Sequence, residues 1–139
     1  MDTGKKVITT KAEFLVDMLE YYCPDPENRR NSIEGRCRYY PIKDRSEGCA
    51  IGRHMTSDSA QQADNVPGET TIDNIYKTWA EFLPTWMLPL GVSFLEKCQE
   101  LHDLSELWED KGLSKSGKRE VSNICLIHGI DKELVKQWL

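Results

Sequence analysis

The stretch Cys37-Arg-Tyr-Tyr-Pro-Ile-Lys-Asp-Arg-Ser-Glu-Gly-Cys-Ala-Ile-Gly-Arg53 holds two cysteines, a tyrosine pair and two glycines. In its first part, small or aromatic residues alternate with polar ones, which is the period of a half-buried strand. A polar turn between Lys43 and Gly48 separates this part from a second, mostly apolar run. The pattern predicts a β-hairpin near residues 36–53. Two strands alone are marginally stable in water, so we expect the hairpin to pack on helices.

The hairpin pattern divides its side chains between two faces. We expect an inward face made of Cys37, Tyr39, Cys49 and Ile51. The two cysteines would then lie across from each other, either as a packing pair or, if oxidised, as a disulfide. An aromatic residue flanked by arginines is a common interface anchor. The outward residues are therefore candidates for contact with a partner: Arg36, Arg38, Tyr40 and Arg53.

Helical spacing dominates the rest of the chain. Thr10-Lys-Ala-Glu13 resembles a capping box, and the apolar stripe after it predicts a helix that ends at the proline-rich Cys23-Pro-Asp-Pro26. Similar stripes predict helices over 72–83, from 93 to a stop at 111–112, over 116–128 and over 131–138. The polar residues 56–71 are typical of a long flexible loop. A chain of 139 residues has room for one domain, so we expect a single α+β domain, 1–139, mainly helical, with about five helices and one hairpin.

Charge is distributed unevenly along the chain. Residues 29–54 carry seven Lys and Arg against three Asp and Glu, whereas residues 55–110 carry two against eleven. The acidic block disfavours direct nucleic-acid binding and favours a basic partner surface; a merely solvated acidic face is the alternative. The acidic residues that we take as candidates for partner binding are Asp64, Glu69, Asp73, Glu81, Glu100, Glu106 and Glu109.

Compartment is indicated by what the sequence lacks. No run approaches the ~18 apolar residues of a membrane span. The first ten residues contain lysines but no apolar core of a secretory signal. The five cysteines are odd in number and sparse, unlike those of a secreted disulfide framework. These features predict a cytoplasmic protein with reduced thiols and no membrane partner.

Cysteine and histidine spacing raises an alternative of metal or thiol chemistry. Two pairs at helical spacing could meet as a tetrahedral zinc site: Cys98 and His102, and Cys125 and His128. A second, irregular set is Cys23, Cys37, Cys49 and His54. Cys49 could act as a nucleophile if Arg53 and His54 lowered the pKa of its thiol. Core cysteines and helix-end histidines explain both sets more simply, and no phosphate-binding glycine motif occurs. We assign no catalytic residue, metal site or cofactor.

Two separated motifs resemble a family of small, functionally uncharacterised proteins of bacteriophages and bacteria. The first is a Cys-x-Tyr followed by Cys-Ala-Ile-Gly-Arg, found here as Cys37, Tyr39 and 49–53. The second is a helix of the form Phe-Leu-x-x-x-Gln-x-x-His-Asp, found here over 94–103, with Trp108 after it. The resemblance covers roughly residues 10–130. It implies a viral or mobile-element origin and supplies no reaction.

Charge pattern and resemblance together indicate a function. We expect a non-enzymatic protein-binding module, plausibly a phage-encoded inhibitor of a host defence or nucleic-acid enzyme, that acts through its acidic surface in the host cytoplasm. The partner would be a host protein with a basic, nucleic-acid-binding surface. The alternative is a small metal- or thiol-dependent enzyme that uses the cysteines and histidines.

Overall fold

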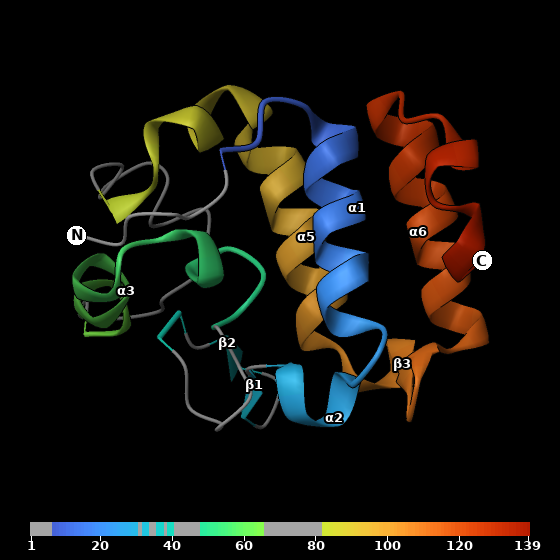
Figure 1. Ribbon diagram of the computed structural model, residues 1–139, viewed down its shortest axis with the longest axis horizontal. Coiled ribbons are helices and arrows are strands. Elements are labelled where there is room, and N and C mark those ends of the chain that lie inside the picture. The colour runs from blue at the N-terminus through green and yellow to red at the C-terminus, as the bar shows by residue number, and fades with distance from the viewer. Residues whose placement is uncertain (1–6, 31, 34–35, 38, 41–47, 66–81) are drawn as a thin grey trace.

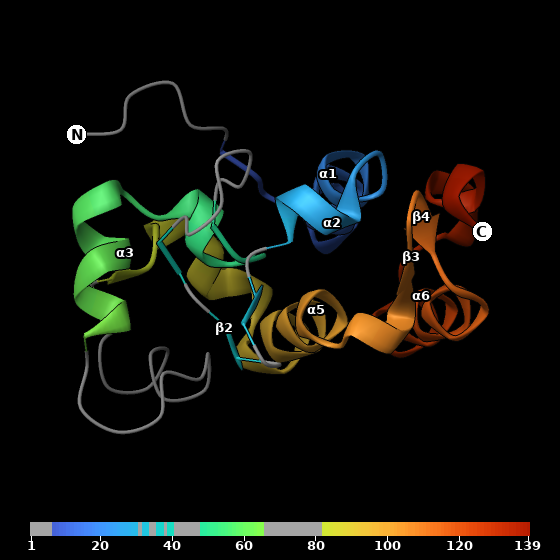
Figure 2. The ribbon, with the colours of Figure 1, turned by 90° about the horizontal axis from the view of Figure 1, so that it is seen from below.

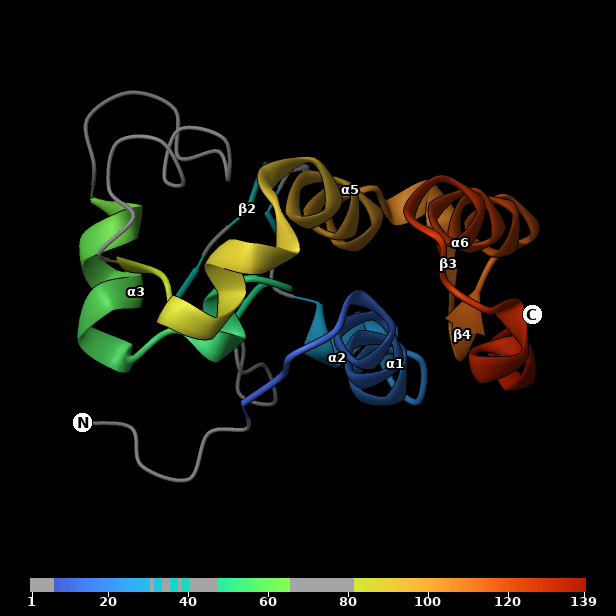
Figure 3. The ribbon, with the colours of Figure 1, turned by 90° about the horizontal axis from the view of Figure 1, so that it is seen from above.

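The computed structural model describes residues 7–30, 32–33, 36–37, 39–40, 48–65 and 82–139, and of residues 32–33 and 36–37 only the backbone. The three longest helices in this part are α1 (Lys11–Tyr22), α5 (Val92–Asp103) and α6 (Lys115–His128). Their axes lie nearly side by side, with α1 and α5 running in one direction and α6 in the other (Figure 1). Viewed along these axes, α1, α5 and α6 stand at the corners of a triangle (Figures 2 and 3).

Helix α1 forms where the capping pattern predicts it. The Thr10 hydroxyl accepts a hydrogen bond from the amide N–H of Glu13 at 3.1 Å, which satisfies one of the unpaired donors of the first turn. The helix ends at Tyr22, just before Pro24. Its buried face contains the predicted stripe together with Phe14, so the pattern of four apolar residues determined which side faces the core.

A β-hairpin is present, but it pairs a different strand from the one predicted. After α2 (Pro26–Arg29), β1 (Ser32–Ile33) pairs antiparallel with β2 (Arg36–Cys37). The second half of the quoted stretch is not a strand: Cys49–Ile51 form a turn that leads into the 3₁₀ helix η1 (Gly52–His54). The expected class, a mainly helical α+β fold with one hairpin there, is confirmed, while the expected pairing of 36–40 with 49–53 is wrong.

The segment expected to be a loop contains a helix. Residues 57–64 form α3 (Ser57–Asp64), and the Thr56 hydroxyl accepts a hydrogen bond from the Ser59 amide at its start. Ala60 and Ala63 are its buried residues, so small side chains provide a contact face that a search for large apolar residues misses. Residues 66–71 and most of the helix expected over 72–83 lie outside the described residues. The apolar turn that follows is the 3₁₀ helix η3 (Thr85–Leu90).

Helix α5 is shorter than predicted. It ends at Asp103, and the expected continuation to Lys111 is replaced by η4 (Ser105–Leu107) and a second hairpin of β3 (Trp108–Glu109) and β4 (Gly112–Leu113). Gly112 has φ +118, a conformation that favours glycine, so it marks this turn and not a helix end.

The C-terminal part follows the sequence signals closely. Helix α6 is capped by Ser114 at its start and by Gly129 at its end. Gly129 has φ +68, the left-handed backbone conformation in which many α-helices end. The last expected helix is a pair of 3₁₀ turns, η5 (Lys132–Leu134) and η6 (Lys136–Trp138), and the Asp131 side chain caps the first. Buried side chains of all these regions form one apolar cluster. Within the described ranges, no helix is long and apolar enough to cross a membrane.

Candidate functional site

Within residues 37–53, the backbone at Tyr39 passes very close to segment 48–52. We call this close approach the crossing. Tyr39, Cys49 and Ile51 are fully buried, which confirms the predicted inward face for these three; the side chain of Cys37 lies outside the described residues. A Cβ atom on Gly52 would lie 2.1 Å from the carbonyl oxygen of Tyr39, and one on Gly48 would lie 2.4 Å from the same oxygen. The two glycines are therefore required by close approach of the Tyr39 backbone.

Asp64 fixes the other side of this crossing. Its two carboxylate oxygens accept hydrogen bonds from the amides of Tyr39 and Tyr40, at 2.8 and 3.0 Å. The Tyr40 side chain itself is exposed, as predicted for a contact residue. Asp64 was expected to face a partner, but its carboxylate is occupied by backbone donors inside the chain. Its position at the end of α3 explains why it reaches them.

Arg53 is held within the fold and offers little surface. Its guanidinium forms a salt bridge with Asp17 of α1 and lies over the Tyr21 ring, 4.2 Å from the ring centre. Only 11% of the Arg53 side chain is exposed. The same Asp17 carboxylate lies 3.6 Å from Nε2 of His54. Arg53 was predicted to face outward. In the structure it faces inward, because its guanidinium pairs with the Asp17 carboxylate of α1.

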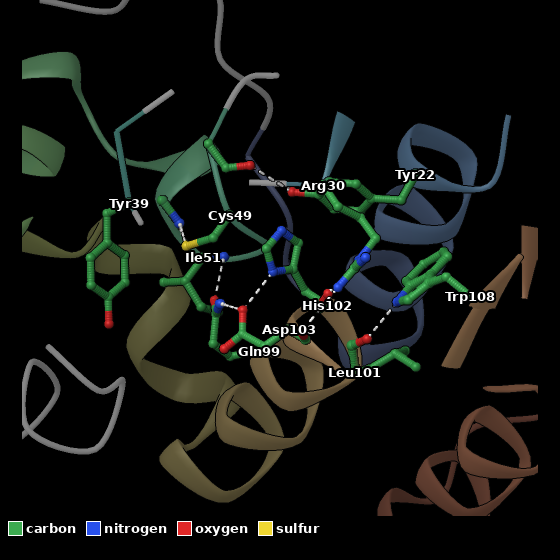
Figure 4. A network of polar contacts seen from close by, with 12 residues as sticks. Tyr22, Arg30, Tyr39, Cys49, Ile51, Gln99, Leu101, His102, Asp103 and Trp108 are labelled. Carbon is green, nitrogen blue, oxygen red and sulfur yellow. Dashed lines mark hydrogen bonds and ion pairs between the residues drawn. The ribbon is translucent and has the colours of Figure 1, made fainter. Parts of the chain in front are cut away.

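A buried polar network lies beneath the crossing, at the C-terminal end of α5 (Figure 4). The Gln99 side chain accepts a hydrogen bond from the Ile51 amide at 3.3 Å and donates one to the Asp103 carboxylate at 2.9 Å. Nδ1 of His102 lies 2.7 Å from the same Asp103 oxygen. The motif Gln-x-x-His-Asp thus places three polar side chains at one end of a helix, where they fasten the Cys49–Gly52 turn.

Arg30 completes this network from the other side. Its Nε donates to the carbonyl of His102 at 2.7 Å, and its terminal nitrogen donates to the carbonyl of Asp103 at 2.9 Å. These carbonyls have no partner within the helix, so the guanidinium ends α5 at this point. Burial lowers the pKa of Arg30, although the Asp103 carboxylate opposes the shift. Nearby, the Trp108 indole donates to the Leu101 carbonyl at 2.8 Å.

The four cysteines whose side chains are described, Cys23, Cys49, Cys98 and Cys125, are buried thiols. Among the described residues, no three Cys, His, Asp or Glu side chains come together as a metal site, so the set on α5 and α6 is not assembled. Burial raises the pKa of Cys23 to about 12 and raises those of Cys98 and Cys125, which keeps these thiols protonated. His102 is fully buried, whereas 17% of the Asp103 side chain beside it is exposed.

Three of the predicted acidic residues have exposed side chains within one short stretch of the chain, whose other face is buried. Glu100, Glu106 and Glu109 are exposed on the last turn of α5, on η4 and on β3. Residues 96–110 hold six carboxylates against one lysine, a net −5. Exposed Leu104 lies between Glu100 and Glu106. We call residues 96–110 the acidic segment. The remaining candidates lie outside the described side chains: Arg36, Arg38, Glu69, Asp73 and Glu81.

Sequence reasoning missed three residues that organise this region. Asp17 and Gln99 occur at polar positions next to apolar stripes, and Arg30 lies in a segment read as polar loop. A polar residue beside a helix's apolar stripe was the available signal for the first two. Arg30 had no local signal, because its partners are more than seventy positions away.

The comparisons give no relative from which to infer a role. No family model, no curated protein sequence and no solved structure matches this chain. The resemblance to phage and bacterial proteins therefore stays a prediction carried by its two motifs.

Proposed function

We propose that the chain is a non-enzymatic protein-binding module that contacts a basic partner surface through the acidic segment. The observation that carries this proposal is the exposure of Glu100, Glu106 and Glu109 within a segment of net charge −5. A cluster of one sign steers an oppositely charged partner and raises its association rate.

The apolar residue within the acidic segment supports a specific contact over simple solvation. Leu104 is 37% exposed and follows directly after α5, with carboxylates on both sides. Interfaces combine such an apolar centre with a charged rim. The well-packed crossing and polar network behind it keep this segment in place, since Arg30 fixes the carbonyls at the end of α5.

The alternative of a thiol- or metal-dependent enzyme has less support. The pKa values that are shifted for described cysteines are shifted upward, whereas a nucleophilic thiol needs a lowered pKa. The narrower proposal, a phage-encoded inhibitor of a host defence or nucleic-acid enzyme in the host cytoplasm, rests on the resemblance and on the charge that such an enzyme's basic surface would attract.

A capture experiment tests the proposal. The purified chain is immobilised and incubated with a bacterial lysate at about 50 mM or about 500 mM NaCl. The higher concentration strongly screens the attraction between oppositely charged surfaces. The variant Glu106→Lys with Glu109→Lys reverses two charges of the acidic segment. We expect a specific protein to be captured at low salt, and its recovery by this variant to fall about tenfold or more.

The matched control reverses two exposed glutamates elsewhere. Glu20→Lys with Glu133→Lys changes the net charge by the same amount and leaves the acidic segment intact. Its recovery of the captured protein should stay within about twofold of the unmodified chain, because the contact itself is unchanged. Equal losses in both double variants would contradict the proposed surface, as would capture that is indifferent to salt.

A further inference from the structure

The three histidines of the chain, all described, have different electrostatic surroundings. Nε2 of His54 lies 3.6 Å from the Asp17 carboxylate, and Nδ1 of His102 lies 2.7 Å from that of Asp103. A proton added to either ring meets a negative charge. His128, in the last turn of α6, differs: its Nε2 is closed to solvent, and within the described part of the chain it has no hydrogen-bond partner.

Two lysines, Lys11 and Lys97, act on His128. Its ring meets the Phe94 ring of α5 edge-on, with the ring centres 5.2 Å apart. The ammonium of Lys11, at the start of α1, lies 6.0 Å from the centre of that Phe94 ring. Lys97 of α5 is the second cation acting on the imidazole. Glu100 lies 3.7 Å from the Lys97 ammonium and offsets part of its charge, but both side chains are largely exposed.

The segment after α6 adds no clear carboxylate partner. Asp131 and Lys132 lie near Cys125, one turn before His128, and their charges oppose each other there. The carbonyls at the C-terminal end of α6 favour a cation, as at any helix end. Burial and the two lysines act in the opposite direction, and together they lower the pKa of His128.

A second proton on His128 would therefore put a charged N–H group into a site without an acceptor. The ring would carry a positive charge beside Phe94 of α5, where Lys11 and Lys97 already disfavour it. The His128 side chain is only partly buried, but its Nε2 is closed to solvent and, among the described residues, has no partner, so a charged N–H there is unfavourable. The simplest relief is outward movement of the helix end. Gly129 follows immediately and ends the helix, so only the final turn has to move.

We propose that protonation of His128 releases the C-terminal end of α6 from α5, which gives the fold an acid-sensitive contact. This inference is independent of the acidic segment and of any partner.

The direction of the pH dependence follows from linkage. The folded pKa of His128 is below the unfolded value of 6.5, so the folded state binds fewer protons than the open state. The stabilisation is complete above pH 6.5 and is lost as the pH falls through the folded pKa. Each unit by which the pKa is lowered corresponds to about a tenfold change in the opening equilibrium.

Amide hydrogen exchange at about pH 7.5 and about pH 5.5 tests the proposal, with rates divided by the intrinsic rate at each pH. The amides of Gly129 and Ile130 report the final turn, since both bond to the Cys125 carbonyl. We expect their opening to increase severalfold at the lower pH, and the central α1 amides to change less. An equal increase in α1 would mean global destabilisation and would overturn the proposal.

Two variants tie the effect to His128. In His128→Gln, which does not titrate, the selective opening at low pH should disappear. Lys97→Gln changes an exposed side chain and should fold normally, and it should reduce the acid effect by weakening the repulsion. If the acid-induced opening of Gly129 and Ile130 is unchanged in both variants, His128 is not the group responsible.

Discussion

The two ends of helix α5 each contact a histidine, but the surroundings of the two histidines differ. At the C-terminal end, His102 lies beside Asp103, and Gln99 and Arg30 complete a connected network. At the N-terminal end, the ring of Phe94 packs against His128, whose Nε2 has no hydrogen-bond partner among the described residues and whose neighbouring charges are lysines. The first end joins distant segments firmly, and the second joins α6 to the core through a contact that a proton weakens.

The difference shows what a buried polar group contributes. A satisfied network fixes one arrangement, because each group would lose a partner in any other. An unsatisfied buried nitrogen lowers stability even at neutral pH, and it lowers stability further in acid. The acidic segment follows the well-fixed end, which suits a surface that must keep its shape for a partner.

The largest expected effect is at the crossing beside His102. In Gly52→Ala, the new Cβ would lie 2.1 Å from the Tyr39 carbonyl oxygen and 2.4 Å from its Cα, both backbone atoms. We expect a loss of about 3 kcal/mol or more in the free energy of unfolding, measured by urea denaturation. Gly129→Ala is the control at the other end: no atom lies within 4 Å of its Cβ, so only the positive φ costs about 1 kcal/mol.

A smaller loss is expected when the network loses its cation. Arg30→Ala would leave the carbonyls of His102 and Asp103 without their donors. We expect the free energy of unfolding to fall by about 2 kcal/mol. Arg30→Lys should recover part of this, because one ammonium cannot reproduce the fork of two donors. Lys97→Ala, a cation removed at the other end of α5, should change stability by less than about 0.5 kcal/mol. If Arg30→Ala and Lys97→Ala lowered the free energy of unfolding equally, the proposed difference between the two sites would be contradicted.

The smallest expected effect is an increase in stability, in the variant His128→Phe. In His128→Phe, a ring of similar size replaces one with an unsatisfied buried nitrogen, so we expect a gain of about 0.5 kcal/mol near pH 7.5. His102→Phe should instead lose about 2 kcal/mol, because the partly buried Asp103 carboxylate loses its imidazole partner. Urea denaturation of both variants measures the pair. A loss in His128→Phe would show that His128 has a partner.

Local signals predicted the long helices well. Thr10 begins α1, Gly129 ends α6, and the apolar stripe of α1 faces the core as expected. Each of these features depends on residues within a few positions of one another, so a capping side chain or a periodic pattern is enough to specify it. The inward orientation of Tyr39, Cys49 and Ile51 was predicted correctly even though the second strand was not, since burial follows from residue type in either structure.

Four of the errors involve partners far apart in the chain. Apolar residues at helical spacing continued past Asp103, yet Arg30 ends α5 there by bonding the carbonyls of His102 and Asp103. Strand β2 pairs with β1, which precedes it in the chain. Residues 49–51, which were expected to pair with β2, form a turn close to the Tyr39 backbone. Asp64 and Arg53 were read as surface charges because nothing nearby in sequence reveals their backbone and Asp17 partners.

The sequence by itself determined the class of fold, the main helix ends and the position of the acidic segment, because composition, caps and period act over short distances. Only the tertiary structure decided which polar residues are available at the surface. Burial and long-range hydrogen bonds drew Asp64 and Arg53 inward and left Glu100, Glu106 and Glu109 exposed. The same packing gave His102 a carboxylate and left His128 with lysines, a difference that depends on which helices meet and that no local pattern encodes.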